Sequence, residues 1–343
     1  MERKSGIVTF DSAPDPGDIN LGIGQPSADL LPVDLLREAA DHFLAHAHPL
    51  DLNYGERQGD GQFRAALAGF LAPEYDFPVT PGSLFLTTGN SQALDFVCGQ
   101  FARQGDTVFI EEPSYFLAHK IFSDHGLDVI GIPVDRDGLV IDRLEEELAR
   151  RRPALLYTIP SFHNPGGQTL SGDRRRELAR LSRKHDFIVV ADEVYQMLHY
   201  SGRPPPAMGT MIAEGNILSL GSFSKIMAPG LRLGWIQASP DLMERILATG
   251  VVNSGGSFNH FASHVMRHAI ELGLQQQLLE RLRATYSKRV ATMDSALREY
   301  LGGRAKWRRP GGGYFFWIEL ESRVDTVELK AGAAELKTGF QPG

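Results

Sequence analysis

A lysine and an arginine follow one short apolar segment of the chain. The apolar run 217–220 leads into Gly221-Ser222-Phe223-Ser224-Lys225, and Arg232 comes seven residues after the lysine. A lysine beside an apolar sheet edge loses hydration, which lowers the pKa of its amine and favours the neutral nucleophile that forms imines. The planar guanidinium of an arginine suits a phosphate. A lysine that extends its amine to solvent is the simpler alternative.

Three further turns carry polar residues that chemistry could use. Gly89-Asn90-Ser91 opens a helical segment, whose free backbone N–H groups suit a phosphate. Asn164 lies in a turn rich in proline and glycine, and Asp192 and Tyr195 follow the apolar run 187–191. A carboxylate at the end of a buried strand needs a cation or a hydrogen-bond donor beside it. Each turn taken alone is also typical of helix capping or of an internal salt bridge.

Together the four turns offer a phosphate cradle, an amide, a carboxylate, an amine and a guanidinium. One kind of ligand matches this whole set, namely an aldehyde cofactor with a phosphate group and a ring nitrogen that can be protonated. The combination is therefore more informative than any single turn. It favours a cofactor site over a series of unrelated structural roles.

These turns follow the strands of a predicted parallel sheet. Short apolar runs alternate with helical patterns over residues 80–240, which is typical of an α/β fold whose sheet is covered on both faces. Ligands bind beyond the carboxyl ends of such strands, so the polar turns should meet at one edge of the sheet. The predicted strands are 84–87, 108–111, 129–134, 154–159, 187–191, 217–220 and 233–238.

The C-terminal third has a different pattern. Apolar residues recur every three or four positions from Leu274 to Leu297, which predicts one long amphipathic helix. A glycine-rich break at 310–313 precedes an alternating strand at 314–320 and a helix at about 326–336. We expect a three-layer α/β/α domain with a mostly parallel sheet, plus a smaller α+β domain. The expected divisions are 1–45 for an N-terminal segment that joins the small domain, 46–250 for the large domain, and 251–343 for the linking helix and small C-terminal domain.

The motifs in these turns resemble those of the class I/II pyridoxal-phosphate aminotransferases, which have fold type I. Ser222-Phe223-Ser224-Lys225 and the following segment 228–234 are similar to the cofactor-lysine signature of that family. Asn164-Pro165-Gly166-Gly167 and the run Ala-Asp-Glu-Val-Tyr at 191–195 match two more family motifs, and 21–26 and Tyr54-Gly55 also fit. The resemblance covers about residues 17–343. The run 161–170 is most similar to the branch of aminoadipate and kynurenine aminotransferases, which also resembles the effector domains of some transcription regulators.

The resemblance implies a role for each site residue. Lys225 would bind the cofactor as a Schiff base and move the Cα proton of the substrate, and Asp192 would keep the pyridine nitrogen protonated. Tyr195 would hydrogen-bond the 3′-oxygen of the ring, and Tyr115 would stack on its face. Asn164 would share the contact with the 3′-oxygen and, with Gly24, would touch the substrate carboxylate. The residues that would hold the phosphate are Asn90, Ser91, Ser222, Ser224 and Arg232.

The implied reaction moves an amino group between an amino acid and a 2-oxo acid, with pyridoxal 5′-phosphate as the cofactor. In the family, the residue that matches Tyr54 reaches the phosphate of the neighbouring subunit, so a homodimer is implied. In the family, further chain follows a turn like Gln341-Pro342-Gly343 and carries the arginine that clamps the substrate carboxylate. We therefore expect either a truncated chain or a carboxylate that is held by another group.

Three alternatives stay open. The same cofactor supports lyase, decarboxylase and racemase reactions through closely related carbanions, which the sequence does not separate from transamination. A truncated chain would bind the cofactor and turn over slowly. A ligand-sensing domain of a transcription regulator would need a DNA-binding domain ahead of the motifs, and only about twenty residues, with a net negative charge, precede them here.

Composition limits the partners and the compartment. The 343 residues are 42% hydrophobic and 22% charged, and Lys+Arg 35 against Asp+Glu 42 gives a net charge of −7. That charge provides no field that would attract nucleic acid or an anionic membrane. The sequence has no apolar stretch of the length that a signal peptide or membrane span needs, so we expect a cytoplasmic protein without nucleic-acid or membrane partners. The single cysteine, Cys98, lies in an apolar helical pattern, and we expect it in the core.

Two polar patterns are interpreted as surface features. His260, His264 and His268 recur every four residues, and no cysteine or suitably spaced carboxylate accompanies them. We therefore expect an exposed or interface stripe and no metal site. Three consecutive arginines at 174–176 would point in different directions on a helix, so we expect a solvated face there.

Overall fold

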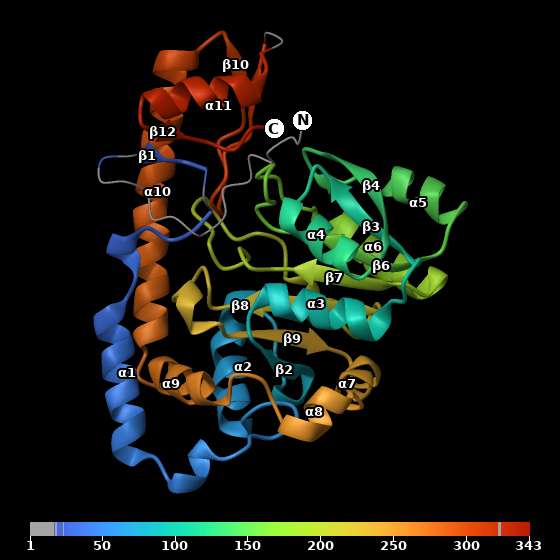
Figure 1. Ribbon diagram of the computed structural model, residues 1–343, viewed down its shortest axis with the longest axis vertical. Helices are drawn as coiled ribbons and strands as arrows, with labels where there is room; N and C mark the ends of the chain where they lie inside the picture. The colour runs from blue at the N-terminus through green and yellow to red at the C-terminus, as the bar shows by residue number, and fades with distance from the viewer. Residues whose placement is uncertain (1–16, 18, 23, 322–323) are drawn as a thin grey trace, which may run out of the picture.

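A mixed sheet of eight strands forms the centre of the part of the chain that the computed structural model describes, which is residues 17, 19–22, 24–321 and 324–343 (Figure 1). The strand order is β2-β9-β8-β7-β6-β3-β4-β5. The pairs from β8 to β4 are parallel, whereas β9 is antiparallel to both of its neighbours. The strands of this sheet are β2 (Leu84–Thr87), β3 (Thr107–Glu112), β4 (Asp128–Asp135), β5 (Gly138–Leu139), β6 (Pro153–Thr158), β7 (Ile188–Asp192), β8 (Ile217–Ser222) and β9 (Gly234–Ala238).

The seven predicted strands are confirmed, and no end differs from its prediction by more than two residues. Every residue of β2, β7, β8 and β9 is buried, as a continuous apolar run predicts for a strand covered on both faces. Successive side chains of a strand point to opposite faces. In β3, Val108 and Ile110 therefore join one hydrophobic cluster, whereas Phe109 joins the cluster on the other face.

Helices cover both faces of this sheet, so the expected three-layer α/β/α architecture is confirmed. The helices α3 and α4 contribute to one cluster, and α5 and α6 contribute to the other. Cys98 on α3 is buried as expected, and burial raises the pKa of its thiol to about 12. Within the described residues, no helix combines the length and apolarity needed to cross a membrane. The helices are α1 (Val33–His46), α2 (Gly61–Tyr75), α3 (Asn90–Phe101), α4 (Phe116–Asp124), α5 (Ile141–Leu148), α6 (Gly172–His185), α7 (Pro240–Leu247), α8 (Gly250–Gly255), α9 (His260–Glu271), α10 (Leu274–Leu301) and α11 (Thr326–Glu335).

The long helix α10 leads from the α/β part to a smaller group of elements at the top of Figure 1. There β10 (Ala305–Trp307) pairs antiparallel with β11 (Ile318–Leu320), and α11 lies beside them. The short strand β1 (Ile19–Asn20) pairs in parallel with β12 (Thr338–Gly339), so the N-terminal segment contacts the last described residues. The helix expected at about 326–336 is confirmed as α11.

The strand predicted at 314–320 is wrong in its first half. Only Ile318–Leu320 forms a strand, and the preceding segment packs as a loop on residues 198–201. Tyr200 N donates to Gly311 O at 2.7 Å, and Gly313 N donates to Leu198 O at 2.9 Å. These bonds tie the chain immediately before residue 314 to residues 198–201. The alternating sequence pattern could not reveal that partner.

The expectation of an exposed or interface histidine stripe is wrong in its first part for His264 and His268, and the interface part stays a prediction. His264 and His268 are buried, with 3% and 6% of their surface exposed, because α9 packs along α1. The ring of His264 stacks on Phe43 of α1 at a centroid distance of 5.0 Å. His268 Nδ1 lies 3.0 Å from His42 Nδ1, a contact that requires one ring nitrogen to donate and the other to accept. No group of metal-ligating side chains is found in the described segments.

Candidate active site

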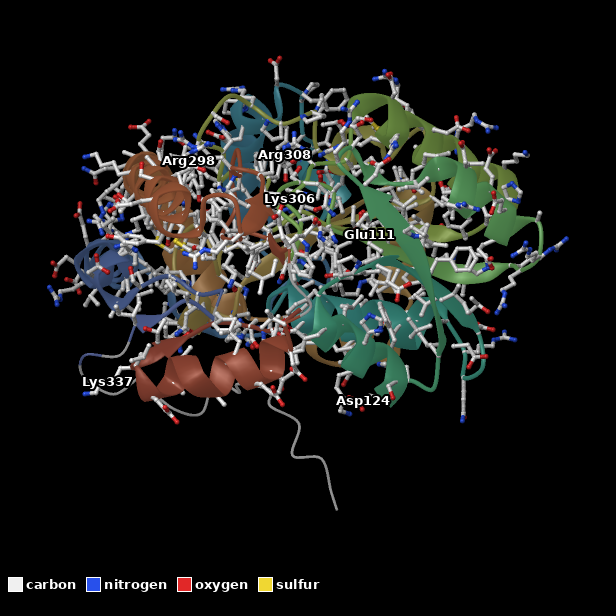
Figure 2. The ribbon with its side chains drawn as sticks, turned by 90° about the horizontal axis from the view of Figure 1, so that it is seen from above. Glu111, Asp124, Arg298, Lys306, Arg308 and Lys337 are labelled. Carbon is white, nitrogen blue, oxygen red and sulfur yellow. The ribbon has the colours of Figure 1, made fainter. Side chains whose placement is uncertain are left out.

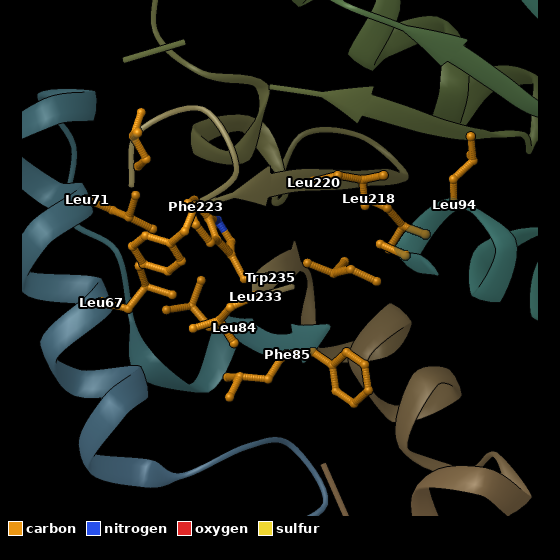
Figure 3. Packing of buried hydrophobic residues seen from close by; sticks show 14 of the residues in the cluster. Leu67, Leu71, Leu84, Phe85, Leu94, Leu218, Leu220, Phe223, Leu233 and Trp235 are labelled. Atoms are coloured by element: carbon orange, nitrogen blue, oxygen red, sulfur yellow. The ribbon is translucent and has the colours of Figure 1, made fainter. Parts of the chain in front are cut away.

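The connection between β8 and β9 carries both Lys225 and Arg232. Because these two strands are antiparallel, the loop leaves and re-enters the sheet at the same edge. Phe223 N donates to Leu233 O at 3.1 Å and closes the loop. The side chains of Phe223 and Leu233 are buried in the cluster that Figure 3 shows, together with Trp235 of β9. The hydrophobic core therefore anchors the two ends of the loop, and its polar residues are left at the sheet edge.

Lys225 is half-buried, and its amine lies in a constrained environment. The Nζ group donates to the backbone oxygen of Gly24, and it lies 5.6 Å from the ring centroid of Tyr314. Burial lowers the pKa of the Lys225 amine to about 8, while the negative charge of Asp192 opposes this shift and Arg232 adds to it. The predicted loss of hydration at this lysine is thus present in the structure. A pKa near 8 leaves a substantial fraction of neutral amine at physiological pH.

Asp192 ends β7 and is 8% exposed. Its carboxylate accepts hydrogen bonds from Tyr157 Oη at 2.9 Å and from Asn90 Nδ2 at 2.6 Å. Burial raises the pKa of Asp192, whereas these two donors and the charge of Lys225 hold it down. A buried carboxylate with fixed donors on one side is suited to bind a cationic ring nitrogen, because each charge offsets the desolvation of the other.

Tyr157 was not among the predicted site residues, although the sequence contains a signal for it. Strand β6 pairs with β7 so that Tyr157 lies opposite Val190. Asp192 lies two residues after Val190 and therefore on the same face of the sheet. An aromatic side chain can reach such a diagonal neighbour. A tyrosine in an otherwise apolar strand, placed next to the aspartate strand, would have indicated this contact once the strand order was known.

A cradle for an anion lies where α3 begins. Gly89 has a φ of +92°, and a Cβ at this position would lie 2.8 Å from the Arg232 guanidinium, so that side chain rests directly against the start of α3. The first backbone N–H groups of a helix have no partners within the helix and attract anions. Ser222 Oγ lies 2.9 Å from Ser224 Oγ on the adjoining loop. These donors fit a phosphate group.

Asn90 is placed differently from the expectation. We predicted a phosphate contact for its side chain, but its amide nitrogen contacts Asp192. Its amide oxygen is buried and has no hydrogen-bond partner in the structure. A phosphate contact of Asn90 would therefore come from its backbone N–H at the start of α3. Ser91, the next residue, is exposed.

Two tyrosines lie close enough to Asp192 for its charge to affect them. Burial is the main cause that raises the pKa of Tyr115 to about 12, and the charge of Asp192 adds to it. Tyr195 is 3% exposed, and the same two causes raise its pKa further. Both hydroxyls therefore stay protonated at neutral pH and can donate to an anionic oxygen of a bound ring. Asn164 is half-buried in the loop that follows β6.

A buried histidine and glutamate hold the loop that carries Asn164. Glu111, labelled in Figure 2 at the end of β3, accepts from Ile159 N at 2.8 Å and lies 3.2 Å from His163 Nε2. His163 Nδ1 accepts from Gly166 N at 3.3 Å, so the ring proton belongs on Nε2, which faces the Glu111 carboxylate. His163 and Glu111 are each 1% exposed. The pair fixes the backbone on both sides of Asn164.

A second buried network corrects the expectation for the arginine run. Arg174 and Arg176 are partly exposed, but Arg175 is 0% exposed. Its guanidinium donates to Leu170 O, Pro206 O, Pro160 O and Ser161 Oγ at 2.7 to 3.0 Å. It also lies 3.8 Å from the buried carboxylate of Glu193, the residue after Asp192. The prediction was wrong for Arg175 because the middle arginine of α6 faces the core, where loop carbonyls need donors.

The segment around Tyr314 also belongs to the site, although the sequence analysis did not single it out. Tyr195 lies 5.6 Å from Tyr314 and 5.9 Å from Phe315, measured between ring centroids. A Cβ on Gly24 would lie 2.6 Å from the Phe315 ring, so only a glycine allows this approach. Gly24, Tyr314 and Phe315 are thus brought to Lys225 from opposite ends of the chain. Tyr54, in contrast, is 84% exposed.

The doubly covered sheet, the lysine and aspartate at its carboxyl edge and the adjoining anion cradle define a pyridoxal-phosphate enzyme of fold type I. The chain belongs to the class I and II aminotransferases, because residues 16–335 match the sequence profile described as "Aminotransferase class I and II". It is therefore a transferase that moves amino groups with pyridoxal phosphate as its cofactor.

Individual relatives agree with this assignment. The aromatic-amino-acid aminotransferase 1 of Thermococcus litoralis is 33% identical, over 95% of this chain and 79% of its own length. The solved structure of Pyrococcus horikoshii kynurenine aminotransferase is 30% identical, with a TM-score of 0.87 over 95% of this chain and 81% of its own. The uncharacterized HTH-type transcriptional regulator YisV of Bacillus subtilis is also similar, at 31% identity over 89% of this chain and 62% of its length.

Proposed function

We propose that the chain catalyses transamination through a Schiff base at Lys225, with aromatic amino acids as donors and a 2-oxo acid as acceptor. The observation that carries the proposal is the amine of Lys225, which has a lowered pKa and lies within electrostatic reach of the buried Asp192. When bound, pyridoxal phosphate supplies a carbonyl group that condenses with amines and a ring that accepts the electrons of a broken C–H bond.

Each site residue would have its own role in this reaction. The Lys225 amine, when neutral, takes a proton from the substrate Cα and returns it on the cofactor side. Asp192 holds a proton on the ring nitrogen, and Tyr157 and Asn90 keep its carboxylate oriented. Tyr195 would donate a hydrogen bond to the ring oxygen of the cofactor, and Tyr115 would cover the face of the ring.

Other residues would bind the phosphate of the cofactor and the carboxylate of the substrate. The phosphate would be bound by Arg232, Ser222, Ser224 and the backbone at the start of α3, including Asn90 and Ser91. The substrate carboxylate would contact Gly24 and Asn164. Phe315 lies against Gly24 and Tyr195, and its ring provides an apolar wall for an aromatic side chain. The donor class named for the T. litoralis and P. horikoshii relatives fits this wall.

A screen of amino donors tests the reaction. The cofactor-loaded protein is mixed with tryptophan, phenylalanine, kynurenine, 2-aminoadipate or alanine, while the cofactor absorbance and the products are followed. We expect the aromatic donors to bleach the visible band fastest and to yield one 2-oxo acid per cofactor, and the band to return with 2-oxoglutarate. Release of carbon dioxide or ammonia, or racemised amino acid without a 2-oxo acid, would instead identify a decarboxylase, lyase or racemase.

We propose a homodimer, since one face of the protein carries several exposed apolar side chains. Leu50, Leu52, Tyr54, Val251 and Phe261 are 52–84% exposed. The segments that carry them lie together, because Arg57 Nη1 donates to Asn253 Oδ1 at 3.1 Å and Ser257 N donates to Glu56 O at 3.0 Å. Exposed apolar side chains on neighbouring segments are typical of an interface. Tyr54 would reach the phosphate in the partner site from this face.

Subunit complementation tests this arrangement. Tyr54→Ala and Lys225→Ala homodimers should each have low activity, because every site lacks one of the two groups. After mixing, dissociation and reassociation, each heterodimer should contain one site with both groups intact, so activity should recover to about a quarter of wild type, as random pairing of two half-defective chains requires. The matched control mixes Tyr300→Ala, an exposed tyrosine on α10, with Lys225→Ala. No recovery with Tyr54→Ala would place Tyr54 and Lys225 in the same subunit's site.

A further inference from the structure

Tyr314 makes two separate contacts with Lys225. Its ring centroid lies 5.6 Å from the Lys225 amine nitrogen, within the range of a cation–π interaction. Its hydroxyl lies 3.3 Å from the backbone oxygen of Lys225 and donates to it. The same tyrosine thus contacts both ends of the lysine residue, which the proposed function uses as its central group.

Other tyrosines hold the Tyr314 ring in this position. Tyr286 Oη lies 3.1 Å from Tyr314 Oη, and the Tyr195 ring lies on another side at 5.6 Å. Tyr200 Oη donates to Gly313 O at 2.7 Å, and Gly313 itself has a φ of +69°, which favours glycine. Because the Tyr314 hydroxyl has one proton and donates it to Lys225 O, Tyr286 must donate to Tyr314. The ring is therefore preset before any ligand binds.

We infer that Tyr314 is a positioning residue for Lys225, which holds the free amine beside the cofactor site and stabilises its protonated form. The inference rests on the proposed function, in which Lys225 must be released and then carry a proton. The negative face of an aromatic ring attracts a cation most strongly where water is excluded. Burial raises the pKa of Tyr314 itself, so its hydroxyl acts as a donor and not as a base.

Tyr314 acts with Asp192 and against burial and Arg232 on the protonation of the amine. Asp192 favours the protonated amine, whereas burial and Arg232 favour the neutral form. Gly24 O accepts a hydrogen bond from the amine. The ring of Tyr314, like Asp192, favours the protonated form of the Lys225 amine. It thereby keeps most of the amine protonated at neutral pH, while a smaller neutral fraction can accept a proton.

Competitive labelling of the cofactor-free protein with acetic anhydride measures this effect without relying on turnover. The rate of labelling at Lys225 is measured by mass spectrometry of its peptide as a function of pH, with the exposed Lys306 as internal reference. We expect a wild-type midpoint near pH 8. In Tyr314→Leu the midpoint should fall by about 0.5–1 unit, the loss expected for one cation–π contact. Tyr314→Phe keeps the ring but loses the two hydroxyl contacts that hold it, so its midpoint should fall by less than that of Tyr314→Leu.

Two further variants keep the inference open to refutation. Tyr286→Phe removes the hydroxyl partner of Tyr314 and should shift the midpoint in the same direction by a smaller amount, even if Tyr314→Leu fails to fold. Tyr300→Leu, on the exposed surface, should change nothing. Equal midpoints in wild type, Tyr314→Leu and Tyr286→Phe would overturn the inference, as would a rise in Tyr314→Leu. A separate result would contradict the proposed function, namely a Lys225→Ala protein that still converts amino donors.

Discussion

Replacing Lys225 with alanine should reduce transamination by at least about 10⁴-fold, since proton transfer by a positioned base typically contributes 10²–10⁴-fold and the covalent attachment is lost as well. In the proposed function this amine is the base; it lies between Gly24 and Tyr314, and its pKa is lowered to about 8. The measurement is the steady-state rate with a donor found in the screen, together with the visible absorbance of the bound cofactor.

Chemical rescue and a matched control make this test specific. The alanine variant leaves a space beside Tyr314 that a small primary amine can enter, so added methylamine should restore part of the rate. Lys306→Ala removes an exposed lysine and should leave the rate unchanged. A Lys225→Ala protein with normal folding, normal rate and an unchanged absorbance band would contradict the proposed role. Loss of the folded state would be detected by circular dichroism.

Arg175→Met should cost about 3–5 kcal/mol of unfolding free energy, because removing one partner of a buried ion pair leaves the other uncompensated. Arg175 is fully buried and protonated, although burial lowers the pKa of its guanidinium to about 10. The variant would leave Glu193 buried beside Ser219 and the backbone of η4 (Met208–Met211) without its cation. It would also remove the Arg175 donors from the carbonyls of Leu170 and Pro206, and one of the two donors from the carbonyl of Pro160.

The adjacent arginine provides the control. Arg176→Met removes an exposed i,i+3 pair with Asp173 on the same helix and should change the unfolding free energy by about 0.5 kcal/mol or less. Urea unfolding followed by circular dichroism measures both variants, with the cofactor at saturation. Similar small losses for Arg175→Met and Arg176→Met would show that the buried network is not needed for stability. Arg175→Lys should give an intermediate loss, since an ammonium cannot reach all of the acceptors.

The sequence by itself determined the sheet and the chemistry at its edge. Buried parallel strands require continuous apolar runs such as those of β7 and β8, and this pattern is local. The polar turns after those strands then had to meet at the carboxyl edge, where Lys225, Asp192 and Arg232 are found. The desolvation of Lys225 followed from the same reasoning, and the structure confirms its direction.

Only the tertiary structure decided which side chains contact these groups. Tyr157 and Asn90 reach Asp192 from other elements, and Tyr314 reaches Lys225 from a loop almost ninety residues away along the chain. Arg175 and His264 were expected at the surface and are buried, because α6 packs on the loops after β6 and β7 and α9 packs on α1. Periodicity reports whether a face is apolar, but it does not report which distant segment covers that face or where a carbonyl needs a donor. Those partners are set by packing between segments that are far apart in the sequence, and local patterns contain no record of them.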